Sequence, residues 1–176
     1  MSEEAAKLRG SQIHLLLEIL PSVDPADWAL RSNGILSGGD LAAEAADIPA
    51  LLAEVTSVLS NPDLAFLFGK GTLAEIPVSA TLPELGGQRV HGLIDRLIIQ
   101  PDRILAVDFK TNGVVPDTPD TCPEGILRQM GAYAAALRLI YPDRQIDTAI
   151  LWTRTARLMP LSNDLVMGAL RRSSLP

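Results

Sequence analysis

The chain has 176 residues, of which 47% are hydrophobic, and its net charge is −6. This length suits one domain that buries a full core, and the apolar content excludes a disordered chain. No apolar run is long enough to span a bilayer, and the acidic start Met1-Ser2-Glu3-Glu4 is not typical of a signal peptide, so we expect a cytoplasmic protein without a membrane partner. The single cysteine, Cys122, excludes an internal disulfide and an all-cysteine metal or iron–sulfur site.

Charge is distributed unevenly along the chain. Residues 1–76 carry a net charge of −7 and residues 77–127 carry −3, whereas residues 128–176 carry +4 and are rich in arginine. Because a phosphate backbone responds to the local patch, the total charge does not exclude nucleic acid, but it does not support tight binding by the chain alone. The distribution suits a module to which larger partners deliver the substrate.

The first seventy residues are expected to form a helical layer. Apolar residues recur there at helical spacing, and asparagine or aspartate followed by proline gives the start signals. The pattern predicts helices over residues 8–20 and from Asp24 to Gly34, a helix that begins at Asp40 and is interrupted or restarted at Pro49, and a turn of helix from Asn61 to Gly69.

From residue 71 onward the pattern changes to the period of strands, with β-branched residues between turn signals. The predicted elements are strands over residues 73–82, 89–100 and 103–109, a proline-rich loop over 112–123, a helix over 124–141, one or two strands over 145–153 and 157–161, and a final helix capped by Ser162. This order predicts an α/β (α+β) fold with a mixed sheet. We expect one domain over residues 1–176, with a helical layer at 1–70, a core sheet and helix at 71–161, and a C-terminal helix and tail at 162–176.

Three charged side chains lie on two neighbouring predicted strands. Asp108 and Lys110 are two residues apart, so they face the same side of one strand, and Asp95 lies on the strand that pairs with it across the turn at Pro101. Carboxylates that face each other repel unless a cation lies between them, and a hard divalent cation such as Mg²⁺ prefers oxygen ligands of this kind. The alternative for Asp108 and Lys110 is an exposed ion pair, worth about 0–1 kcal/mol.

Asp95 followed by Asp108-Phe109-Lys110 resembles the core motif of the PD-(D/E)XK nuclease superfamily, in which an acid, a spacer and acid–x–lysine follow one another. Three further motifs give this pattern a context, and the set spans residues 10–153. They are Gly10-x-x-x-His14, Gly92-x-x-Asp95-Arg96 and Gln129-x-x-x-Tyr133. In this order the motifs resemble the RecB-like branch of the superfamily. Together with Glu75-Ile76-Pro77-Val78, they are most similar to the C-terminal nuclease domain of the AddA helicase–nuclease.

The resemblance implies a restriction-endonuclease-like core and a metal-dependent deoxyribonuclease, an exonuclease rather than an endonuclease. It implies that Asp95 and Asp108 hold Mg²⁺ together with His14 and the backbone carbonyl of Phe109, and that Mn²⁺ can substitute. The relatives that carry an iron–sulfur cluster need four cysteines, so no such cluster is expected in this chain.

The remaining site residues also take their roles from the resemblance. Lys110 would orient or deprotonate the attacking water and offset charge at the phosphorus. Gln129 and Tyr133 would position the nucleophile or the DNA backbone, and Glu75 would support the metal ligands without binding the ion itself. Simpler interpretations stay open, because Gln129 and Tyr133 could form a helix edge with a buried ring, and His14 could be packed or solvated.

The resemblance also implies a biological setting. It indicates a domain of an AddAB/RecBCD-type helicase–nuclease that processes double-strand break ends for recombinational repair. Its partners would then be DNA, an AddB-type subunit and a helicase portion of the same protein, although the chain itself has no phosphate-binding G-x-x-x-x-G-K-[ST] motif. Two alternatives are a catalytically silent nuclease-like module that binds a helicase or partner subunit, and a stand-alone RecB-like endonuclease.

Overall fold

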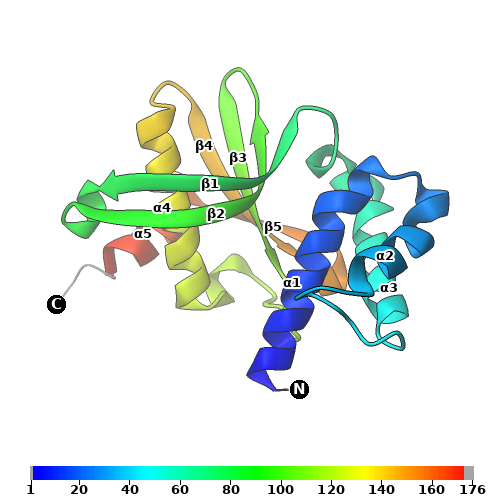
Figure 1. The fold of residues 1–176 in the computed structure, drawn as a ribbon. Helices are drawn as coiled ribbons and strands as arrows, with labels where there is room; N and C mark the ends of the chain where they lie inside the picture. Colours follow the sequence, from blue (N-terminus) through cyan, green and yellow to red (C-terminus); the bar gives the residue numbers. More distant parts are fainter. Residues whose placement is uncertain (1, 173–176) are drawn as a thin grey trace. The chain divides into compact units, whose positions relative to one another are not determined.

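The computed structural model describes residues 2–172 and contains a five-stranded sheet in the order β1-β2-β3-β4-β5 (Figure 1). The strands are β1 (Thr72–Leu82), β2 (Gln88–Ile99), β3 (Arg103–Lys110), β4 (Gln145–Trp152) and β5 (Arg157–Leu161). The first three strands are antiparallel neighbours, whereas the connection from β3 to β4 contains the helix α4 (Glu124–Ile140), a crossover of the kind that parallel neighbours need. The prediction of a mixed sheet flanked by helices, with an N-terminal helical region, is confirmed.

The chain divides into two compact units. The helical unit comprises the residues up to Gly69 together with 109–113 and 152–157, and the sheet unit comprises 70–108, 114–151 and the residues from Leu158 onward. The chain therefore passes from one unit to the other within β3, where Asp108 counts with the sheet unit and Phe109 with the helical unit. The single domain stays a prediction, and residues 173–176 of the predicted tail lie outside the described residues.

The helical unit is built from amphipathic segments whose apolar faces were visible in the sequence. Its helices are α1 (Glu3–Ile19), α2 (Trp28–Leu36) and α3 (Ile48–Leu59). Short 3-10 turns at Leu20–Ser22 and Pro25–Asp27 lie between α1 and α2, and a 3-10 segment at Pro62–Leu67 follows α3. Ile13, Leu16 and Leu17 of α1 are fully buried, as their helical spacing requires. The predicted caps are present, since the side chain of Asp24 accepts from the Ala26 amide and that of Asn61 from the Asp63 amide.

The predicted helix from Asp40 is wrong. Residues 37–47 form turns and irregular chain, and α3 begins only at Ile48. Gly39 has a left-handed backbone conformation with φ of 81°, which stops α2 from continuing. The side-chain amide of Gln12 then donates to the backbone carbonyls of Leu41 and Ala42, at 3.3 and 3.1 Å, and so satisfies acceptors that a helix would have used internally.

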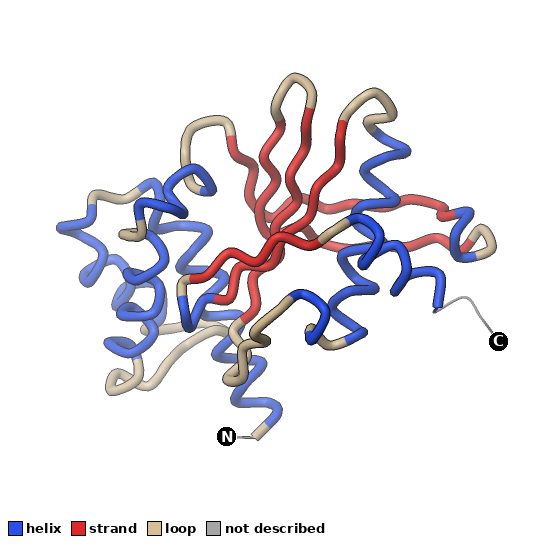
Figure 2. Tube along the Cα trace, turned by 180° about the vertical axis from the view of Figure 1, so that it is seen from behind, coloured by secondary structure: helices blue, strands red, loops and turns tan. Residues whose placement is uncertain are grey.

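In the sheet unit, β1 and β2 form a long hairpin that extends beyond the other strands, with its far end beside the C-terminal helix α5 (Asn163–Arg172) (Figures 1 and 2). Helices α4 and α5 pack closely at Gly131, where an added Cβ atom would lie only 2.4 Å from the carbonyl oxygen of Val166. Among residues 2–172, no helix combines the length and the apolar character that crossing a bilayer requires.

We expect Gly131→Ala to lower the free energy of unfolding by about 1–3 kcal/mol, because the new methyl group meets backbone that cannot rotate away. Gly125→Ala is the matched control on the same helix, since an added Cβ there meets nothing within 4 Å and alanine is the better helix former. Urea denaturation of both variants measures the difference. Equal stability of the two would show that α4 and α5 are not packed at Gly131 in solution.

Candidate functional site

Two acidic side chains face each other across β1 and β2. The ladder pairs Ala74 with Arg96 and keeps the same register two residues further on, so Glu75 stands opposite Asp95. Carboxylate oxygens of Glu75 and Asp95 lie within 4.8 Å of each other, and only 6% of Asp95 is exposed. Because like charges repel more strongly away from water, two carboxylates held this close make a favourable position for a cation.

A third acid continues this line onto β3. Arg96 pairs with Val107, which places Asp108 at the position opposite Asp95. Asp108 is 3% exposed, so it is more deeply buried than Asp95. Glu75, Asp95 and Asp108 therefore occupy one row across three adjacent strands of the sheet unit, and we call them the acidic row. The sequence motif predicted two of these positions as metal ligands, and the sheet register adds the third beside them.

The backbone of Glu75 is unusual. Its φ is 51°, in the left-handed region that non-glycine residues seldom occupy, although it lies within β1. The ladder between β1 and β2 is interrupted at this residue and is regular on both sides of it. Such a conformation costs roughly 1–3 kcal/mol and is found where the surrounding structure imposes it, often at functional sites. The strain coincides with the residue whose carboxylate meets Asp95, which supports a functional role for Glu75.

Gln129 and Tyr133 of α4 are held together as the i, i+4 motif predicted. The Gln129 side chain donates to the Tyr133 hydroxyl at 2.9 Å, and that hydroxyl donates to the carbonyl oxygen of Leu93 at 2.8 Å. The ring lies so close to Gly92 that a Cβ atom at this position would be 2.4 Å from it. The glycine of the Gly92-x-x-Asp95 motif therefore makes room for the aromatic ring.

The environment of Tyr133 keeps its hydroxyl protonated at neutral pH. Burial raises the pKa of the phenol, and the negative charges of Asp108 and Asp95 raise the pKa further, while the hydrogen bond from Gln129 acts in the opposite direction. The influence of both acids on one phenol shows that α4 brings Tyr133 into the field of the acidic row. At neutral pH the tyrosine is thus a hydrogen-bond donor.

Two of the predicted metal ligands meet within the helical unit. His14 of α1 and Phe109 at the end of β3 have ring centroids 5.8 Å apart, and the imidazole Nε2 lies 3.2 Å from the Phe109 carbonyl oxygen. This separation is that of a hydrogen bond in which the imidazole N–H donates to the carbonyl. It is also close to the spacing of about 3 Å between neighbouring ligands of an octahedral ion with bonds of about 2.0–2.1 Å. Gly10 permits the close approach, because its added Cβ would be 3.2 Å from Thr111 Oγ1.

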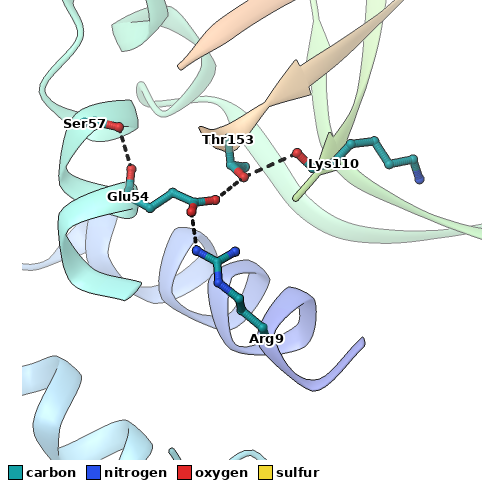
Figure 3. A network of polar contacts seen from close by, with 5 residues as sticks. All are labelled: Arg9, Glu54, Ser57, Lys110 and Thr153. Carbon is teal, nitrogen blue, oxygen red and sulfur yellow. Dashed lines mark hydrogen bonds and ion pairs between the residues drawn. The ribbon is translucent and has the colours of Figure 1, made fainter. Parts of the chain in front are cut away.

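The backbone at Lys110 is tied to a polar network that sequence reasoning missed (Figure 3). The fully buried hydroxyl of Thr153 lies 2.5 Å from Glu54 Oε1 and 3.3 Å from the Lys110 carbonyl oxygen, and Arg9 forms an ion pair with Glu54. The Lys110 side chain extends away from this network in Figure 3. Glu54 comes from α3, Arg9 from α1, and Thr153 from the 3-10 turn Thr153–Thr155 that follows β4. They belong to no recognisable motif, so no local signal marked them.

The donor sets fit a hard divalent cation. The sheet unit offers the carboxylates of the acidic row, and the helical unit offers the His14 imidazole and the Phe109 carbonyl oxygen. Carboxylate and carbonyl oxygens are the usual ligands of Mg²⁺, and an imidazole also suits Mn²⁺. Lys110, whose side chain carries an amine, follows Phe109 directly in the sequence. These groups are the ones that metal-assisted hydrolysis of a phosphodiester requires.

Comparison with known proteins gives one decisive result. The sequence profile described as the PD-(D/E)XK nuclease superfamily matches residues 1–158, which is most of the chain. The chain belongs to the PD-(D/E)XK nuclease superfamily. With its mixed sheet and flanking helices, its fold is of the restriction-endonuclease-like type. The RecB-like branch and the similarity to AddA stay predictions.

Two further comparisons were made. A sequence search of curated proteins found no significant match. Among solved structures, a similar chain is found in the crystal structure of SSO0001, with 11% sequence identity and a TM-score of 0.40 over 98% of this chain and 84% of that chain.

In a Tyr141→Phe background, which leaves Tyr133 as the single tyrosine, we expect Asp108→Asn to lower the pKa of the phenol. Removal of a nearby negative charge makes the phenolate easier to form, so the titration midpoint moves to lower pH. The ultraviolet absorbance of tyrosinate, followed against pH, measures this midpoint. Asp120→Asn, the same charge change in an exposed loop, is the control, and equal midpoints for the two variants would contradict the proximity of Asp108 and Tyr133.

We expect Thr153→Val to lower the free energy of unfolding by about 1–2 kcal/mol, because a valine of similar shape leaves buried acceptors of Glu54 and Lys110 without their hydroxyl. Ser57→Ala removes an exposed hydroxyl that donates to the backbone carbonyl of the same Glu54, and its effect should stay within about 0.5 kcal/mol. Thermal denaturation compares the two, and equal losses would argue against the network.

Proposed function

We propose that this superfamily domain is a Mg²⁺-dependent deoxyribonuclease that hydrolyses phosphodiester bonds at the acidic row. The observation that carries the proposal is the placement of Glu75, Asp95 and Asp108 on adjacent strands, with an oxygen pair within 4.8 Å and two of the acids almost fully buried. Carboxylate oxygens gathered in this way are the ligands that a hard divalent cation prefers.

In this proposal Asp95 and Asp108 are the carboxylate ligands, and His14 and the Phe109 carbonyl are the further ligands. When bound, the ion would supply Lewis acidity to a phosphoryl oxygen and lower the pKa of a coordinated water toward neutrality. Mn²⁺ is expected to substitute, because it accepts the same mixture of oxygen and imidazole ligands. Glu75 supports these ligands through its carboxylate, which the strained backbone of β1 holds opposite Asp95.

The remaining proposed roles belong to Lys110 and to side chains that donate hydrogen bonds. Lys110 orients or deprotonates the attacking water and offsets the charge that builds up on the phosphorus. The Tyr133 hydroxyl, which stays protonated, and the Gln129 amide position the nucleophile or a phosphate oxygen through hydrogen bonds. The Thr153 network positions the main chain of Lys110, so that the amine projects from a fixed strand end.

The proposed setting is that of a RecB-like nuclease domain resembling the one at the C-terminus of AddA. The order of the His14, Asp95, Asp108-x-Lys110 and Gln129-x-x-x-Tyr133 motifs supports it. In that setting the domain acts as an exonuclease on double-strand break ends in the cytoplasm, alongside a helicase portion and an AddB-type subunit. A net charge of −6 is consistent with a domain that receives DNA from partners.

Cleavage of single-stranded DNA with Mg²⁺ or Mn²⁺ tests the catalytic claim. We expect Lys110→Ala to reduce the rate at least about 100-fold, the usual loss for a general acid or base, while it still binds Mn²⁺ in a calorimetric titration. Asp108→Ala should lose both cleavage and Mn²⁺ binding. Lys70→Ala, which removes an exposed lysine, is the matched control and should cleave like the unaltered chain.

Two results would overturn the assignment. Equal cleavage by the unaltered chain and Lys110→Ala, above a control without protein, would rule out Lys110 as a catalytic residue. Mn²⁺ binding that survives in Asp108→Ala would place the metal elsewhere. An unaltered chain that binds no Mn²⁺ and cuts no DNA would favour a catalytically silent module.

A further inference from the structure

The β1–β2 hairpin continues past the acidic row as a two-stranded arm. Because side chains alternate across a strand, the face that carries Glu75 and Asp95 also carries every second residue beyond them. The ladder pairs these residues directly across the arm, and all six are exposed. The pairs are Pro77 with Leu93, Ser79 with His91, and Thr81 with Arg89. We call this surface the outer face of the arm.

The opposite face of the arm is covered and holds the arm in place. Val78, Leu82 and Ile94 are buried there, and Gly92 lies against the Tyr133 ring of α4. The tip between β1 and β2 contacts α5, beside the far end of the hairpin (Figures 1 and 2). The outer face is therefore a fixed surface presented to solvent, and it starts at the acidic row.

The chemistry of the outer face changes along its length. Next to the acids lies the apolar pair Pro77 and Leu93, of which Leu93 is 45% exposed. Beyond it come two hydroxyl side chains and two nitrogen donors, Arg89 and His91, and no acidic residue stands on either strand of the arm past the acidic row. Arg89 donates a hydrogen bond from Nε to Ser79 Oγ at 3.1 Å. This partner is neutral, so it orients the guanidinium without neutralising its positive charge.

We propose that single-stranded DNA reaches the acidic row along the outer face of the arm, a proposal that rests on the proposed nuclease function. Arg89 and His91 are two residues apart on β2, roughly 7 Å, so they can contact successive phosphates of one extended strand. An imidazole donates a hydrogen bond to phosphate whether it is neutral or charged. The pair Pro77 and Leu93 meets a base or sugar just before the cleaved bond.

The surface fits a single strand better than a duplex. Both nitrogen donors stand on β2, so they follow one phosphate backbone, whereas a duplex would need cations on both flanks of the arm. A flat apolar pair is useful against the face of an unstacked base, which only a single strand offers. Opposite charge also favours the approach, because the arm beyond the acids carries a positive group and the DNA backbone is negative.

The distance between Arg89 and the acidic row determines which substrates test the proposal. Arg89 is six residues from Asp95 along β2, about 20 Å, so a trinucleotide cut at the acidic row cannot reach it, whereas a long oligonucleotide can. We therefore compare cleavage of a thymidine trinucleotide and a thymidine 20-mer by the unaltered chain, Arg89→Ala and His91→Ala in Mg²⁺. Arg31→Ala removes an exposed arginine from α2 and is the matched control for charge.

For Arg89→Ala we expect kcat/KM on the 20-mer to fall about tenfold, as for loss of one charge-assisted contact, and to stay within about twofold on the trinucleotide. The salt dependence of binding to the 20-mer should flatten by about 0.7 in the slope of log K against log salt, the value for one phosphate contact with a single strand. Arg31→Ala should behave like the unaltered chain.

Several outcomes would overturn the proposal. Equal losses on both lengths would indicate a structural defect, and no loss on the 20-mer would remove the arm from the DNA path. If the unaltered chain cuts neither substrate, the proposed function fails, and the DNA path along the arm is then decided by binding of the labelled 20-mer in Ca²⁺, where Arg89→Ala must still bind more weakly than Arg31→Ala.

Discussion

The alignment of Glu75, Asp95 and Asp108 on three adjacent strands is the constraint on which the proposed chemistry depends. The register of β1, β2 and β3 places them in one row, and a slip of one residue in either ladder would turn an acid to the opposite face of the sheet. The hydrophobic pattern of the strands enforces that register, because the same slip would expose the buried side chains. Packing of the sheet thus keeps the three acids in one row.

Helix α4 connects this constraint to the rest of the sheet unit. Its Tyr133 fills the space left by Gly92, donates to the Leu93 carbonyl and lies in the field of two acids of the row. The same contact covers one face of the β1–β2 arm and leaves the other exposed. One glycine and one tyrosine therefore position a donor at the proposed site and orient the surface proposed to guide the DNA.

Much of the fold could be predicted from the sequence because it follows from local patterns. Strand-like patterns of apolar and β-branched residues between turn signals predicted three strands in residues 73–109, and apolar residues at helical spacing around Leu16 predicted α1. The helix expected from Asp40 failed because a distant side chain, Gln12, captures the carbonyls of that segment. The motifs marked Asp95, Asp108 and Tyr133, but the strain at Glu75 and the role of Thr153 arise from ladder register and tertiary contacts, which no spacing encodes.

The left-handed backbone of Glu75 has a consequence for how this chain can change. Glycine adopts that conformation without strain, so a glycine at position 75 would relieve roughly 1–3 kcal/mol and remove a carboxylate from the row at the same time. Selection for thermal tolerance alone would therefore erode the site at this residue. Under the proposed function, the glutamate at this position trades stability for activity, and stabilisation of this fold by substitution would have to leave the position alone.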